Sequence, residues 1–161
     1  MSIKVGDRLP DTKFRMMTPD GPAWKSTDDI FKGKKVALFA VPGAFTGTCH
    51  KMHVPSILQS ADAIKAKGVD TIAVTAVNDA FVMEAWKKST GAEGKIEFLA
   101  DGNGEFAKAI DMTLDGSGNG LGLRSKRYSM LVEDGVVKKL NIEESPGKVE
   151  VSGGDALLKQ L

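Results

Sequence analysis

The chain has a single cysteine, Cys49, and the residues just before it suit a reactive thiol. The segment Pro42-Gly-Ala-Phe-Thr-Gly-Thr-Cys49 follows an apolar run, 35–41, with the composition of a strand buried on both faces. Ligands of open α/β sheets bind beyond the carboxyl ends of such strands. Thr46 can cap a helix that starts there, which places Cys49 in the first turn, where free N–H groups and the helix dipole favour a thiolate. The pattern therefore predicts a nucleophilic cysteine.

Other interpretations of this cysteine remain open from the residues alone. Free cysteine is among the most buried residue types, so Cys49 could be an inert core residue. His53 stands four residues later and could face Cys49 on a helix, as in a Cys-His hydrolase or a metal site. Zinc needs three or four protein ligands, however, and Cys49, His50 and His53 are the only soft candidates. We therefore expect no metal and no bound cofactor, and expect His53 to bond locally and support the loop.

The elements that must position Cys49 alternate between strands and helices. Apolar runs predict buried strands over 35–41, 71–77 and 96–100, and two β runs around Asp134-Gly135 predict a hairpin over 128–142. Apolar residues at helical spacing predict helices over 55–67, 106–110 and 153–161. A further helix, capped by Asn78-Asp79, is predicted to carry its apolar face on Phe81, Val82, Ala85 and Trp86.

This order of elements predicts the fold class. Strand, helix, strand, helix, a hairpin and a final helix are typical of a thioredoxin-like α/β sandwich, with a central mixed sheet flanked by helices. The N-terminal residues, to about Phe31, are expected to form an added hairpin. With no linker or repeat in the chain, we expect one domain over residues 1–161.

Composition and charge exclude several function classes. Hydrophobic residues make up 42% and charged residues 27% of the chain, as in folded globular domains. Basic residues number 22 against 21 acidic ones and are scattered, so nucleic acid is not an expected partner. The start of the chain lacks the pattern of a secretory signal, and no stretch reaches the roughly 18 apolar residues of a membrane span. We therefore expect a cytoplasmic location and no membrane contact.

Two loops resemble ligand motifs only superficially. The glycine-rich run 116–122 lacks the spacing of a dinucleotide-binding turn, and 101–105 lacks the acidic spacing of a calcium loop. The first is expected to be a flexible loop, and the second a turn with an adjoining helix cap.

The pattern Pro42-x-x-x-Thr46-x-x-Cys49 resembles the active-site signature of peroxiredoxins, and Val41-Pro-Gly-Ala-Phe-Thr46 resembles their type 5 group. Three fixed residue types within eight positions make a specific motif. The resemblance covers essentially the whole chain, through His53-Val-Pro55, Ala76-Val-Asn-Asp79, Ala85-Trp86, Leu99-Ala-Asp101 and Arg127-Tyr-Ser-Met130.

The resemblance implies a role for each matching residue. Cys49 is the expected nucleophile, the Thr46 hydroxyl is expected to bind peroxide, and Pro42 to shield the thiolate. Arg127 is expected to supply positive charge beside the sulfur, which suits a guanidinium because it is always charged and has several donors. Without the resemblance, Arg127 would be interpreted as a solvated strand residue.

Three positions depart from the family pattern. Gly47 stands where many relatives have proline, and His50 often corresponds to serine. Val151 lies near the position where some type 5 members carry a resolving cysteine. Because Cys49 is the only cysteine, an internal disulfide is impossible here.

The resemblance implies a thiol peroxidase that reduces hydrogen peroxide and small organic hydroperoxides through a cysteine sulfenic acid. Complete ionisation of an ordinary thiol gains only about thirtyfold at pH 7, or roughly 2 kcal/mol, so donors aimed at the peroxide oxygens must supply the rest. An external thiol must complete the cycle, and glutathione with glutaredoxin is expected ahead of thioredoxin.

Two further expectations concern partners. The resemblance implies a homodimer packed beside the active-site loops, with an exposed Ala44-Phe45 in the contact. The alternative from a different function class is a non-catalytic peroxide-sensing redox protein, in which oxidised Cys49 changes binding to a partner.

Overall fold

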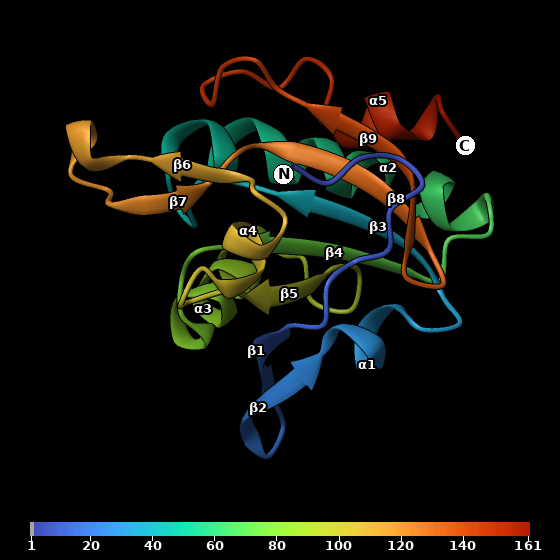
Figure 1. Ribbon diagram of the computed structural model, residues 1–161, viewed down its shortest axis with the longest axis horizontal. Helices are drawn as coiled ribbons and strands as arrows, with labels where there is room; N and C mark the ends of the chain where they lie inside the picture. The colour runs from blue at the N-terminus through green and yellow to red at the C-terminus, as the bar shows by residue number, and fades with distance from the viewer. Residues whose placement is uncertain (1) are drawn as a thin grey trace.

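The computed structural model describes residues 2–161 and has one large mixed sheet, with strands in the order β2-β1-β5-β4-β3-β8-β9 (Figure 1). Its strands are β1 (Lys13–Thr18), β2 (Gly21–Ser26), β3 (Lys35–Ala40), β4 (Thr71–Ala76), β5 (Glu97–Ala100), β8 (Tyr128–Glu133) and β9 (Val136–Ile142). The predicted thioredoxin-like α/β fold, with a central mixed sheet flanked by helices, is confirmed.

The three central strands β3, β4 and β5 run parallel and are connected by helices α2 (Val54–Ala66) and α3 (Ala80–Thr90). Alternate residues of β3 supply both faces of the sheet: Val36 and Leu38 pack on one side, and Ala37 and Phe39 on the other. Burial of both faces explains the continuous apolar run that predicted this strand.

Two hydrophobic layers sandwich the sheet. One layer joins the sheet to α2, α3 and α5 (Gly154–Leu158), and the other joins it to α1 (Thr27–Phe31), α4 (Glu105–Ala109) and the N-terminal segment. The buried face of α3 agrees with the prediction at Trp86 and at the half-buried Val82, but Ala80 and Met83 complete it, whereas Ala85 is exposed and Phe81 is 67% exposed. No helix within residues 2–161 is long and apolar enough to cross a membrane.

The antiparallel hairpin of β8 and β9 has the two-residue turn Asp134-Gly135 that the sequence predicts. Both turn residues have positive φ, 48° and 79°, as a type I′ turn requires. β8 also pairs with β3 in antiparallel register, with Ala40 opposite Tyr128. This pairing brings the residue before β8, Arg127, next to the loop that leaves β3.

The N-terminal hairpin of β1 and β2 is present as predicted and joins the sheet through a single β1–β5 residue pair, Arg15 with Ala100. A second, two-stranded sheet was not predicted. It consists of β6 (Thr113–Asp115) and β7 (Leu123–Ser125), and the glycine-rich run 116–122 connects them through a short 3-10 turn, η2 (Ser117–Asn119). Figure 1 shows this ribbon reaching outward beside β8.

Candidate active site

The loop after β3 carries Pro42 and Thr46 and leads into a helix whose first residues, including Cys49, have unusual geometry. The helix begins at Gly47, and the five residues Cys49–His53 form a π-helix, η1, before α2. Thr46 precedes this helix, and its carbonyl accepts from the His50 N–H at 2.9 Å. The prediction that the Thr46 side chain caps a backbone N–H of this helix is wrong. The Thr46 hydroxyl instead lies 2.7 Å from the Gly43 carbonyl and 3.0 Å from the Cys49 sulfur.

The Cys49 sulfur lies between two hydrogen-bond donors. Thr46 Oγ1 and Arg127 Nη2 are each 3.0 Å from Sγ. Cys49 is only 1% exposed, and Pro42, which lines one pocket together with Thr46 and Arg127, is buried as well. The structure thus brings together Cys49, Thr46, Arg127 and Pro42. A buried sulfur with two aimed donors is suited to carry negative charge and to react with a small molecule that reaches it.

Arg127 is only 2% exposed, and all three nitrogens of its side chain form hydrogen bonds. Its Nε donates to the Pro146 carbonyl at 2.9 Å, Nη1 to His53 Nδ1 at 2.8 Å, and Nη2 to the Cys49 sulfur. Within residues 2–161, no carboxylate forms an ion pair with it. Because an uncompensated buried charge is costly, a thiolate at Cys49 is the fitting counter-ion.

His53 supports Arg127 and does not contact the sulfur. Its Nδ1 accepts from Arg127, so the ring proton must sit on Nε2, which donates to the Ser152 carbonyl at 2.8 Å. Burial, together with the positive charge of Arg127, lowers the pKa of His53 to about 4. His53 is therefore neutral at pH 7 and serves as an anchor. His53 was predicted to bond locally and support the loop, but its partners Arg127 and Ser152 are distant in the chain, so it supports the guanidinium instead. Because Nδ1 accepts from Arg127, no free base is left for a Cys-His pair.

The burial of neutral His53 predicts a pH dependence of stability. The unfolded histidine takes up its proton near pH 6.5 and the folded one only near 4, so the unfolded state binds more protons between these values. Lowering the pH from 7 to 4 should therefore cost about 3 kcal/mol of unfolding free energy at this residue. Urea unfolding of the wild type and of His53→Gln across this range measures the difference. Parallel pH curves for the two proteins would contradict it.

Several residues of the site were missed from the sequence. Arg124 lies under the loop, donating from Nε to the Leu121 carbonyl at 2.9 Å and from Nη1 to that of Pro42 at 3.4 Å. Pro146 and Ser152 hold the guanidinium and His53 from the segment after β9. No short-range signal could have indicated the contacts to Pro42, Pro146 and Ser152, because these partners are 19 to 99 residues apart in the chain.

The loop face beside the site is aromatic. His50, where relatives often have serine, accepts a hydrogen bond at Nδ1 from Trp86 Nε1 at 2.9 Å and stacks on Phe45, with ring centroids 5.8 Å apart. Phe45 is 48% exposed, but Ala44 is buried, so only half of the expected Ala44-Phe45 surface is exposed. Gly47 is the first helical residue, a position that proline readily occupies.

A pocket of about 340 Å³ is bounded by Thr46 and Arg127, the two residues that hydrogen-bond to the sulfur. It is lined by Pro42, Thr46 and Arg127, by Leu114 and Leu121 of the β6–β7 ribbon, and by Pro146. The glycine-rich connection between β6 and β7 thus contributes a wall of the site. The pocket thus has both apolar side chains, Leu114 and Leu121, and polar ones, Thr46 and Arg127, which suits a small molecule with one polar end.

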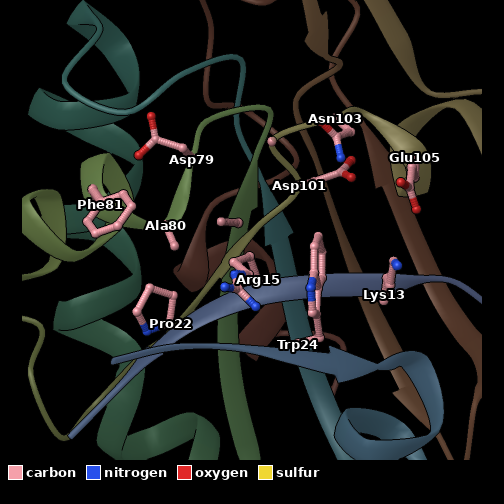
Figure 2. A pocket seen from close by; sticks show the side chains of 12 residues that line it. Lys13, Arg15, Pro22, Trp24, Asp79, Ala80, Phe81, Asp101, Asn103 and Glu105 are labelled. Atoms are coloured by element: carbon pink, nitrogen blue, oxygen red, sulfur yellow. The ribbon is translucent and has the colours of Figure 1, made fainter. Parts of the chain in front are cut away.

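A second pocket, of about 270 Å³, lies between the N-terminal hairpin and the first turn of α3 (Figure 2). Lys13 and Arg15 lie 4.5 and 4.9 Å from the centre of the Trp24 ring, and carboxylates including Asp101 and Glu105 line the pocket as well. None of the predicted site residues lines it. In the described part of the chain, no three histidine, cysteine or acidic side chains gather as a metal site would need.

Comparison with known proteins places this geometry in a family. The redoxin family model matches residues 4–158. The chain is similar to "Peroxiredoxin-2E, chloroplastic" of Arabidopsis thaliana, with 46% identity over 164 residues, which cover 99% of this chain and 70% of that protein. It is also similar to "Peroxiredoxin-2F, mitochondrial" of the same plant, with 46% identity over 133 residues, 83% of this chain and 66% of that protein.

These relatives contradict the predicted cytoplasmic location. The names of both proteins place them in organelles, the first in the chloroplast and the second in the mitochondrion. The prediction was wrong because it rested on the lack of a secretory signal, which does not bear on an organellar location. The residues that build this fold and site do not indicate a location either.

A solved structure agrees with the sequence comparison. The fold is similar to that of reduced Prx3 in complex with H₂O₂ from Vibrio vulnificus, with a TM-score of 0.93, 46% identity and coverage of 98% of both chains. The redoxin match, the identity to curated peroxiredoxins and the Cys49 geometry agree with one another. The chain belongs to the peroxiredoxin family.

Proposed function

We propose that this peroxiredoxin is a one-cysteine thiol peroxidase of the type 5 group, with a single domain over residues 1–161, that reduces hydrogen peroxide and small organic hydroperoxides at Cys49. The observation that carries the proposal is the placement of the Cys49 sulfur 3.0 Å from both Arg127 Nη2 and Thr46 Oγ1. A relative of closely similar fold has been solved with hydrogen peroxide bound.

The reaction follows from these contacts. The thiolate attacks one peroxide oxygen, an S–O bond forms as the O–O bond breaks, and the leaving oxygen takes a proton and departs as water or alcohol. Negative charge moves from sulfur to oxygen during this step. Arg127 donates to the sulfur, and the Thr46 hydroxyl, whose single proton can go to the Gly43 carbonyl or to the sulfur, lies within hydrogen-bond distance of it. Both groups are therefore placed to bond to an oxygen that approaches the sulfur. Pro42 shields the sulfur from bulk water.

The pocket supports the choice of substrates. Hydrogen peroxide needs only the polar groups of Thr46 and Arg127, whereas the apolar side chains of Leu114 and Leu121 can bury a short alkyl or aryl group. Both hydrogen peroxide and small organic hydroperoxides therefore fit the site.

The oxidised enzyme must be restored by an external thiol. Val151, near the position where some type 5 members carry a resolving cysteine, is 45% exposed, and the chain has no second cysteine. We propose that glutathione attacks the sulfenic sulfur and releases water, and that glutaredoxin or a second glutathione then frees Cys49 as the thiol. We also propose a homodimer that packs on the loop side of the site, where Phe45 is exposed.

The function and its reductant can be tested together. With excess glutathione and glutaredoxin, the protein should consume many equivalents of hydrogen peroxide. Protein quenched during turnover should show one glutathione on Cys49 by mass spectrometry, because the small tripeptide can reach the pocket without a docking surface. Without thiol, the same treatment should give sulfinic or sulfonic acid at Cys49.

Two other outcomes would redirect the proposal. Consumption of one equivalent of peroxide with every thiol tried would favour the peroxide-sensing alternative. Sustained turnover with a disulfide-linked dimer through Cys49, and no glutathione adduct, would keep the peroxidase but reject the glutathione route.

A further inference from the structure

The segment between β9 and α5 is closed by one buried carboxylate, that of Glu143. Glu143 follows directly after β9 and is 9% exposed. Its Oε2 atom accepts four hydrogen bonds, from the N–H groups of Glu150, Val151 and Ser152 at 2.9, 2.8 and 2.7 Å and from the Ser152 hydroxyl at 2.6 Å. The carboxylate therefore fastens residue 143 to residues 150–152 and ties the segment 143–152 into a closed loop.

The charge state of Glu143 strengthens this closure. Partial burial acts to raise its pKa, but the hydrogen bonds from the Ser152 hydroxyl and from the three N–H groups outweigh burial and lower the pKa. The group is thus ionised at neutral pH. Hydrogen bonds to an ionised acceptor are stronger than neutral ones, and opening the loop would leave the charge without these donors.

The closed loop presents two carbonyl groups to the site. The Pro146 carbonyl accepts from Arg127 Nε at 2.9 Å, and the Ser152 carbonyl accepts from His53 Nε2 at 2.8 Å. His53 in turn accepts from Arg127 Nη1. Two of the three guanidinium nitrogens are therefore held by this loop, one directly and one through His53. The third is the nitrogen that reaches the sulfur.

The backbone of Glu143 adds a direct link. Its N–H donates to the Arg127 carbonyl at 3.0 Å, so the start of the loop is attached to the residue whose side chain it orients. Since no carboxylate among the described residues pairs with Arg127, these neutral acceptors and the sulfur itself determine where its planar fork points.

We propose that Glu143 is a positioning residue for peroxide reduction, which closes the 143–152 loop so that the Pro146 and Ser152 carbonyls orient Arg127 toward the Cys49 sulfur. The inference rests on the proposed peroxidase function. Glu143 touches neither the sulfur nor the pocket, and it acts through the loop, His53 and Arg127. Small displacements of a group that must meet the transition state cost large factors in rate, even when the thiol itself is unchanged.

The test compares two reactions of the same sulfur. Peroxide reduction needs an aimed donor at oxygen, whereas alkylation by iodoacetamide needs only an accessible thiolate. In Glu143→Ala, the rate constant for single-turnover oxidation of Cys49 by hydrogen peroxide should fall about tenfold, while alkylation changes less than about twofold. Glu143→Gln should lose only about threefold in the peroxide reaction, because its amide oxygen can still accept the same hydrogen bonds. Glu144→Ala, at the exposed next residue, is the matched control and should react as the wild type does.

A second measurement separates positioning from general loosening of the structure. In an Arg127→Lys background, the further loss on changing Glu143 to alanine should nearly vanish, because the fork that the loop orients is absent. Nitrogen NMR of His53 should show a changed hydrogen bond at Nε2 in Glu143→Ala, a readout independent of activity. If Glu143→Ala does not fold, Glu143→Gln carries the same comparisons with its smaller loss.

Failure of the inference is distinct from failure of the function. Equal losses in the peroxide and alkylation reactions, or the full loss persisting beside Arg127→Lys, would make Glu143 merely structural and overturn the proposal. Retention of wild-type peroxide reactivity in both Glu143 variants would overturn it as well. In each case the wild type would still turn over peroxide, whereas a wild type that does not would reject the peroxidase itself.

Discussion

Cys49→Ser is expected to abolish peroxide reduction, with a loss of at least about a thousandfold in turnover. A serine hydroxyl remains protonated at neutral pH and is a poor nucleophile, and it cannot form the sulfenic acid on which the cycle depends. The remaining donors, Thr46 and Arg127, have no reacting sulfur to assist. Peroxide consumption with glutathione and glutaredoxin measures the loss.

The same variant should fold nearly as well as the wild type. Position 49 is 1% exposed, so a polar group there needs hydrogen-bond partners. The serine hydroxyl is smaller than the thiol, and Thr46 and Arg127 are placed to hydrogen-bond with it. We expect the unfolding free energy to change by no more than about 1 kcal/mol. Urea unfolding of both proteins is the control that separates lost chemistry from lost structure. Turnover retained by the folded variant would exclude Cys49 as the nucleophile.

The parts of the fold that were predictable are those with local causes. The run 35–41 is apolar at every position after Lys35 because both faces of β3 are covered, so composition alone indicates a central strand. Asp134-Gly135 predicts its hairpin because both residues must adopt positive φ, which this pair tolerates. These signals need no knowledge of distant segments.

The buried face of α3 shows where local patterns stop. Phe81 and Trp86 are both large and apolar. The predicted face, which includes Phe81, and the observed face, which does not, both have apolar residues at helical spacing. Packing against the sheet selects Ala80, Met83 and Trp86, which leaves Phe81 exposed. The β6–β7 ribbon was missed for a related reason, because strands of three residues are too short to show a period.

The site residues also divide into those that a local motif indicates and those that only distant contacts bring to the site. Cys49 and Thr46 are three residues apart, and a motif captures them. Arg127 is brought to the sulfur by the pairing of β8 with β3, and only the family resemblance indicated it in advance. Glu143 has no local pattern to mark it, since its role depends on donors seven to nine residues later that close a loop.

Arg127→Ala is expected to lower the rate constant for oxidation of Cys49 by hydrogen peroxide by about a hundredfold to a thousandfold, the usual cost of removing one aimed donor. Arg127 Nη2 lies 3.0 Å from the sulfur, and it is the only cationic group that hydrogen-bonds to Cys49 in the described chain. Alkylation by iodoacetamide should fall much less, because that reaction places no charge on a peroxide oxygen. Stopped-flow oxidation and timed alkylation of the same preparation provide the two rates.

Arg127→Lys distinguishes charge from geometry at this position. An ammonium group keeps one positive charge, but it has no planar fork that can meet Pro146, His53 and the sulfur together. If charge alone mattered, lysine would restore most of the rate, whereas the three contacts of the guanidinium predict a loss that stays within about tenfold of that in Arg127→Ala. An unchanged rate in Arg127→Ala would make Arg127 a structural residue and would shift the stabilisation of the leaving oxygen to Thr46 and to the N–H groups of the loop.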